Sequence, residues 1–89
     1  MYTPALIEFL GTALLVGAVA FTSSPVLIVA AFALAIGFGS KISGGHFNPA
    51  VTGWHLMSGH ISQSKALTYM VAQLSAAAFI YLISTVVTI

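Results

Sequence analysis

The sequence is almost without charge. Only 3% of its 89 residues are charged, namely the basic residues Lys41 and Lys65 and the acidic residue Glu8. Water-soluble domains carry about 25% charged residues, so a soluble domain is excluded. Two positive charges are too few to neutralise a row of phosphates, which excludes binding to nucleic acid. A single carboxylate provides no acid/base pair, so we do not expect an enzyme.

The sequence contains no cysteine. It therefore has no disulfide, no thiolate metal ligand and no cysteine nucleophile. A metal site built on His55 and His60 would lack its third and fourth ligands, because zinc is held by three or four protein side chains. We expect neither a metal nor a cofactor.

Hydrophobic residues make up 60% of the sequence and fall into three long runs. A helix needs about 20 apolar residues to cross a bilayer. We predict spanning helices at about residues 4–21, 25–40 and 66–88. The short polar turn at residues 22–25 makes the first two helices antiparallel neighbours. A cleaved signal peptide is the alternative for the first run, but no basic residue precedes this run and Glu8 interrupts it.

A short helix is predicted between the second and third runs. Gly44 and Gly45 disfavour a helix interior, whereas Asn48 can cap a helix that begins at Pro49. About nine residues at 1.5 Å each give a length of about 14 Å, which is half the thickness of a bilayer. Because the surrounding loop is apolar, a re-entrant position is favoured over an interfacial one. We predict an all-α membrane protein with three transmembrane helices and one re-entrant loop and half-helix at residues 43–58.

The start of this half-helix has the chemistry of a neutral-solute site. A helix that begins near the membrane midplane places its unpaired N–H groups and the positive end of its dipole there, and this field repels cations. The Asn48 amide can donate hydrogen bonds to a solute oxygen. The carbonyl groups of Gly44, Gly45 and His46 can accept them. The arrangement suits a small uncharged molecule that carries hydroxyl groups.

Residues 43–52, Ser-Gly-Gly-His-Phe-Asn-Pro-Ala-Val-Thr, resemble the first Asn-Pro-Ala loop of the aquaporin and glycerol-facilitator family, the major intrinsic proteins. Residues 8–12 in the first run, and Lys65, Tyr69 and Gln73 in the third, also occur in the family's order and spacing. The family implies six spans and two half-helices in an inverted repeat that conducts water or small neutral polyols. The resemblance covers nearly the whole chain but only the first repeat, so we expect half of a pore.

The resemblance implies a role for each matched residue. In the family, the glutamate that corresponds to Glu8 accepts hydrogen bonds from the loop backbone, so Glu8 is expected to brace the loop rather than to handle solute. Thr12, Tyr69 and Gln73 are expected to support this brace. The residues expected to line the pore and set its selectivity are Ile28, Ile36, Gly44, Gly45, His46, Asn48, Pro49, Ala50 and Val51.

The mouth of the pore is expected to be apolar. The family's second repeat carries an arginine at the position where this chain, like first repeats, has Val51. In an inverted pair of copies, each mouth would be lined by Ile28 of one copy with Ile36, Gly45 and Val51 of the other. A constriction without a fixed charge is expected to pass glycerol-like solutes at least as readily as water.

The leading prediction is therefore a passive channel for water or small neutral solutes such as glycerol. It would lie in the plasma (inner) membrane as an inverted homodimer or a higher oligomer. Two basic residues give a weak topological bias, which favours insertion both ways, although Lys41 and Lys65 flank the loop and favour the loop and N-terminus inside. The alternatives are a non-conducting fragment or subunit that needs another half, and a small proton-coupled exporter that uses Glu8.

Overall fold

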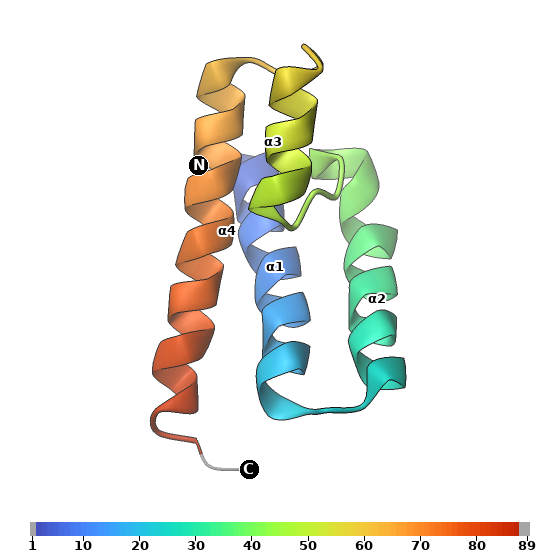
Figure 1. Cartoon of the computed structure of the whole chain (residues 1–89), viewed down its shortest axis with the longest axis vertical. Coiled ribbons are helices and arrows are strands. Elements are labelled where there is room, and N and C mark those ends of the chain that lie inside the picture. Colours follow the sequence, from blue (N-terminus) through green and yellow to red (C-terminus); the bar gives the residue numbers. More distant parts are fainter. Residues whose placement is uncertain (1, 88–89) are drawn as a thin grey trace.

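The computed structural model describes residues 2–87. These residues form four helices, α1 (Thr3–Phe21), α2 (Pro25–Ser43), α3 (Pro49–Met57) and α4 (Gln63–Ser84) (Figure 1). Helices α1, α2 and α4 are long and apolar enough to cross a membrane, whereas α3 is short. The described residues contain no strand. The all-α fold class predicted from the sequence is confirmed.

Local sequence signals set where the helices begin. Pro4, Pro25 and Pro49 each lie in the first turn of a helix, where the missing N–H costs no hydrogen bond. The Ser24 side chain accepts from the backbone of α2, and the Ser62 side chain caps α4 in the same way. Because of this serine cap, α4 begins at Gln63 rather than near residue 66.

Two helix ends differ from the predicted spans. Helix α2 continues to Ser43 rather than ending near residue 40, because the stop is Gly44, whose φ of 93° is left-handed. Glycines earlier in that stretch are accommodated within the helix. Helix α4 ends at Ser84, and the predicted end at residue 88 lies outside the described residues.

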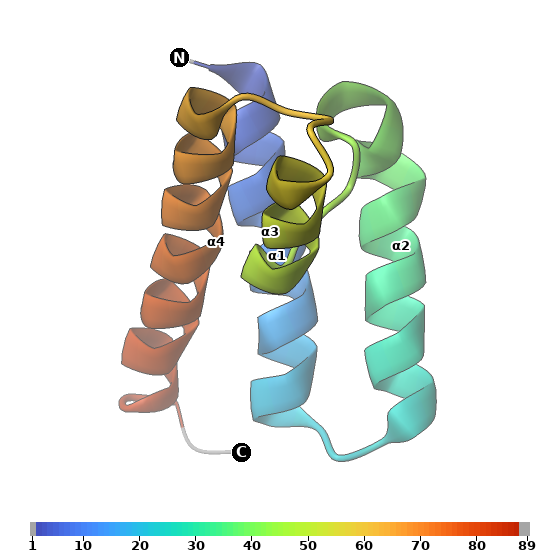
Figure 2. The same ribbon diagram turned by 45° about the horizontal axis from the view of Figure 1, so that its top comes forward.

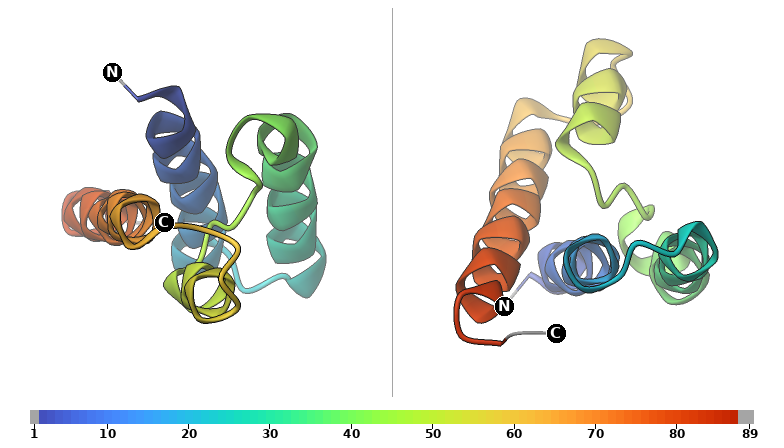
Figure 3. Two further views of the ribbon diagram at one scale, coloured as in Figure 1. Left: turned by 90° about the horizontal axis from the view of Figure 1, so that it is seen from above. Right: turned by 60° about the horizontal axis from the view of Figure 1, so that its bottom comes forward.

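Helix α1 is the central long helix. It packs against α2 on one side and α4 on the other, as the view from above shows (Figure 3). Helix α3 packs against α4, and within residues 2–87 no other pair of helices packs together. Helix α3 begins part-way along the long helices and runs back toward the end at which α2 finishes and α4 starts (Figure 2). This geometry is that of a half-helix inserted from one side.

The distribution of side chains suits lipid rather than water. Small residues occupy the contacts between the long helices, among them Ala31, Ala35 and Ala76, and they let the backbones approach closely. Polar side chains are buried with them, whereas large aliphatic residues such as Leu67 and Leu74 are exposed. An apolar exterior around a partly polar interior is what a bilayer requires of a helical protein.

Candidate functional site: the loop, its brace and an apolar groove

Phe47 anchors the loop that connects α2 to α3. Its backbone is left-handed, with a φ of 53°, a conformation that costs free energy for a residue with a side chain. Its ring is buried between α1 and α2, at the places where Gly11 and Gly39 leave room. A Cβ atom at Gly11 would lie 2.1 Å from the ring, and one at Gly39 would lie 2.6 Å from it. These two glycines are therefore required by the ring rather than by helix geometry.

Glu8 is fully buried and faces the same loop. Its carboxylate accepts four hydrogen bonds, from the Ser43 hydroxyl at 2.7 Å, the His46 N–H at 3.1 Å, the Phe47 N–H at 2.7 Å and the Gln73 amide at 2.9 Å. A carboxylate has about four acceptor sites, so these donors saturate it. The charge on Glu8 is thus balanced by oriented dipoles, and the carboxylate has no free position for a solute.

Tyr69 and Gln73 on α4 extend this network. The Tyr69 hydroxyl donates to the Ser43 carbonyl at 2.6 Å, and the Gln73 amide also donates to the Thr52 hydroxyl at 2.8 Å. Together they tie the end of α2 and the first turn of α3 to α4. Thr12 differs from the expectation, because its buried hydroxyl has no hydrogen-bond partner within residues 2–87. It contributes packing and makes no hydrogen bond to the loop.

The His46 side chain is buried against α3 and α4, so a pore-lining role for this residue remains an expectation for its backbone carbonyl alone. Only 5% of it is exposed, because its ring stacks on His55 with the centroids 4.4 Å apart and meets the Tyr69 ring edge-on. Its Nδ1 lies 2.8 Å from the Thr52 hydroxyl. That hydroxyl also accepts from Gln73, and its own proton is available to Nδ1 when the His46 ring is neutral.

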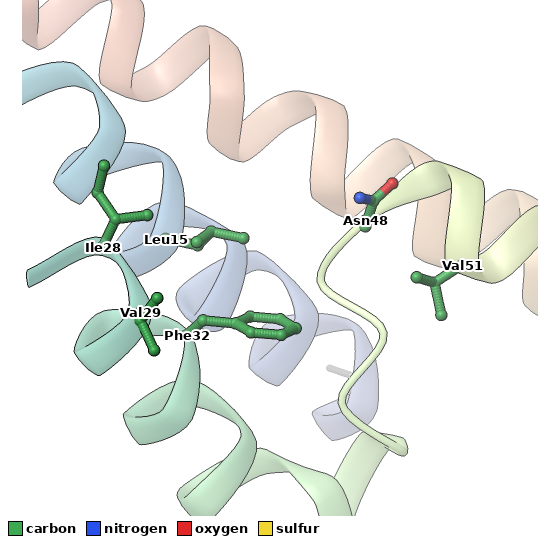
Figure 4. Close-up of a pocket in the computed structure, with 6 residues that line it drawn as sticks. All are labelled: Leu15, Ile28, Val29, Phe32, Asn48 and Val51. Carbon is green, nitrogen blue, oxygen red and sulfur yellow. The ribbon is translucent and has the colours of Figure 1, made fainter. Parts of the chain in front are cut away.

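A groove opens on the side of α2 that faces the start of α3 (Figure 4). It has a volume of about 210 Å³. Its lining residues come from α1, α2 and the start of α3, and they are Leu15, Ile28, Val29, Phe32, Asn48 and Val51. Asn48 is the one polar side chain among them. The groove is thus apolar except for the Asn48 amide, which lies at the N-terminus of the half-helix.

The Oδ1 of the Asn48 side chain is hydrogen-bonded within residues 2–87, whereas its Nδ2 is not. Its Oδ1 accepts from the Ala50 N–H at 2.7 Å, which caps α3. Within residues 2–87 its Nδ2 makes no hydrogen bond, and the side chain is exposed. The amide therefore presents two N–H donors beside the groove.

The residues of the candidate site match a known family. Residues 3–88 fit the sequence profile described as Major intrinsic protein. The chain belongs to the major intrinsic protein family. It is 44% identical over 79 residues to Glycerol uptake facilitator protein-like 6 of Lactiplantibacillus plantarum, an alignment that covers 78% of this chain and 36% of that protein.

Plant members of the family match more locally. Aquaporin TIP1-2 of Zea mays is 56% identical over 41 residues, which cover 46% of this chain and 16% of the aquaporin. Aquaporin TIP4-2 of Zea mays is 49% identical over 53 residues, which cover 55% of this chain and 21% of the aquaporin. The chain thus spans at most 36% of the length of these relatives. No solved structure matches it.

The structure of this major intrinsic protein brings together only part of the expected pore set. Ile28, Asn48 and Val51 line the groove, whereas Ile36 and Gly45 do not. Pro49 and Ala50 form the first turn of α3, and Gly44 ends α2. Sequence reasoning did not identify three lining residues, which are Leu15, Val29 and Phe32. Phe32 lies one helical turn after Ile28, so the i, i+4 spacing on α2 was a usable signal.

Burial of His46 is expected to make the stability of the protein depend on pH. Desolvation lowers the pKa of His46 below its ordinary value of 6.5, although nearby Glu8 acts in the opposite direction. The unfolded chain therefore takes up this proton before the folded chain does as the pH falls. We expect thermal stability in nanodiscs to be greatest above about pH 6.5 and to decline below it. His46→Asn, whose side chain can still accept a hydrogen bond from the Thr52 hydroxyl, should flatten this decline. If the variant kept the native dependence of thermal stability on pH, His46 would not be its source.

Proposed function

We propose that this chain supplies one half of a passive transmembrane pathway for water and small neutral solutes such as glycerol. The observation that carries the proposal is the groove, whose one polar lining side chain, Asn48, stands at the N-terminus of the half-helix. A solute oxygen can accept from the amide there, while the apolar walls contact its carbon atoms. The relative of Lactiplantibacillus plantarum, a glycerol uptake facilitator-like protein, supports a polyol as the solute.

The electrostatics of the groove favour neutral solutes over ions. None of the groove's lining residues carries a charge. The positive end of the α3 dipole lies beside Asn48 and disfavours cations. Glu8 is saturated by its four donors and does not line the groove, so it is a poor proton carrier. This last observation argues against a proton-coupled exporter.

We propose further that a second half in the inverted orientation closes the pathway. The groove is open on one side, and α3 extends along only part of the long helices, so one copy encloses no continuous pore. An inverted second copy would add its own half-helix from the opposite face. A half supplied by a different chain is the second candidate, because the chain spans at most 36% of the relatives' length.

Solute flux through reconstituted vesicles tests the function. We expect liposomes that contain the chain to shrink in an osmotic gradient and to reswell with glycerol faster than empty liposomes. Asn48→Asp keeps the acceptor that caps α3 but replaces the two N–H donors with a negative charge. Hydrogen bonds to such a donor are worth about 1.5 kcal/mol, so glycerol permeability should fall about tenfold, and a cation leak should appear.

Leu34→Ala is the matched control for this experiment, because Leu34 lies on α2, is 62% exposed and does not line the groove. Its permeability should equal that of the native chain. Flux equal to that of empty liposomes, with the protein inserted and helical, would reject a pathway made by this chain alone.

The inverted arrangement has its own test. The chain has no cysteine, so a single cysteine introduced at Ser23, in the exposed turn between α1 and α2, reports topology without background. If both orientations occur, a membrane-impermeant maleimide should label about half of the chains in intact cells. Complete labelling, or none, would reject the inverted homodimer.

A further inference from the structure

We propose that Phe32 sets the upper size limit for solutes in the pathway, an inference that rests on the proposed function. Phe32 lies on α2 and lines the same groove as Asn48 and Val51. Its side chain is 38% exposed, so the ring is not absorbed into the helix contacts. Figure 4 shows the ring extending from α2 toward the loop that carries Asn48. A solute bonded to the amide therefore has the ring across the groove from it.

Phe32 is the bulkiest of the six groove residues and the one aromatic among them. Leu15, Ile28, Val29 and Val51 are aliphatic, and they are smaller than a phenyl ring. The positions expected from the family spacing to form the mouth contain no aromatic ring in this chain. The narrowest contact for a solute is thus expected at Phe32, deeper than the mouth, where an aromatic ring lies on one side and an amide on the other.

The backbone position of Phe32 is set by helix packing. The neighbouring residues Ala31 and Ala35 are buried on the face of α2 that packs against α1. Because α2 approaches α1 through these small residues, the Cα of Phe32 is held by a helix–helix contact rather than by a loop. A selective side chain on a rigid element discriminates size better than one on a mobile segment.

Solute-size selectivity tests the inference. Liposomes with the native chain are compared with those containing Phe32→Ala and Phe32→Trp, using water, glycerol and the five-carbon polyol xylitol as probes. In Phe32→Ala the xylitol-to-glycerol permeability ratio should rise about tenfold, because a pocket wall that loses several carbons discriminates less by about that factor. Phe32→Trp should lower glycerol flux with a smaller effect on water. Leu34→Ala, on the same helix and outside the groove, should leave the ratio unchanged.

The outcomes separate this inference from the proposed function. If the native chain conducts glycerol and Asn48→Asp impairs it, while the xylitol ratio of Phe32→Ala equals that of the native chain, the role of Phe32 is wrong and the pathway stands. If the native chain does not conduct, a pathway made by this chain alone is rejected, and the role of Phe32 in that pathway fails with it. Should Phe32→Ala not insert as a helical protein, Phe32→Leu and Phe32→Trp decide, since they shift the ratio in opposite directions.

Discussion

Replacing Glu8 with glutamine is expected to release the loop and to lower the free energy of unfolding by about 3 kcal/mol or more, since hydrogen bonds to a buried charged group contribute about 1.5–3 kcal/mol each. The four partners of Glu8 are all donors. A glutamine offers one oxygen and one NH₂ group, so the NH₂ group would face donors at one end of the site. The buried N–H of His46 or of Phe47 would then lack its acceptor.

Unfolding by a titration of sodium dodecyl sulfate into mild detergent micelles, followed by circular dichroism, measures this loss. Thr12→Val is the matched control. Thr12 lies one turn after Glu8 on α1 and is also buried, but its hydroxyl has no partner within residues 2–87. Removing an unpaired hydroxyl while keeping the shape should be neutral or slightly stabilising. Equal stability of the two variants would show that the Glu8 network does not hold the loop.

The same variant separates a brace from a proton carrier. If Glu8 braces the loop, Glu8→Gln should lose stability and solute flux together, whether or not a pH gradient is present. If Glu8 carried protons, the variant would remain folded and lose only transport that depends on a pH gradient. The saturated carboxylate leads us to expect the first result.

The sequence was sufficient for the elements but not for all of their ends. Three apolar runs of spanning length predict three long helices, and Asn48 followed by Pro49 predicts a half-helix start. The predicted end of α2 near residue 40 is too early, because the helix continues through the glycines at residues 37 and 39. Gly39 instead serves a tertiary contact with Phe47, and only Gly44 takes the left-handed conformation that ends the helix.

In the site, too, residues placed by local sequence signals could be predicted, whereas residues placed by contacts between helices could not. Asn48 is identifiable from the sequence because its capping role and its place before Pro49 are local. His46 lies two residues before Asn48, yet the direction of its side chain depends on His55 from α3 and Tyr69 from α4, which only the assembled fold brings to it. For the same reason Leu15, which reaches the groove from α1, has no signal in its own helix.

Replacing Gly11 with alanine is expected to destabilise the protein by about 3 kcal/mol, the upper end of what overpacking costs. The new Cβ would lie 2.1 Å from Cε1 of Phe47, and three ring atoms would lie within 2.6 Å of it. The ring cannot withdraw easily, because the Phe47 N–H is bound to Glu8 at 2.7 Å and its backbone is left-handed. The clash therefore displaces the whole loop, and with it the start of the half-helix.

Gly37→Ala on α2 is the matched control, since within the described part of the chain its new Cβ would have no atom within 4 Å apart from its chain neighbours and the adjacent backbone of its own helix. There the change should be neutral or stabilise the helix by up to about 1 kcal/mol, the propensity difference between glycine and alanine. Adding Phe47→Leu to Gly11→Ala should recover part of the loss in the detergent titration, because the smaller side chain vacates the space of the ring. Equal stability of Gly11→Ala and Gly37→Ala would mean that the Phe47 ring does not occupy the gap between α1 and α2.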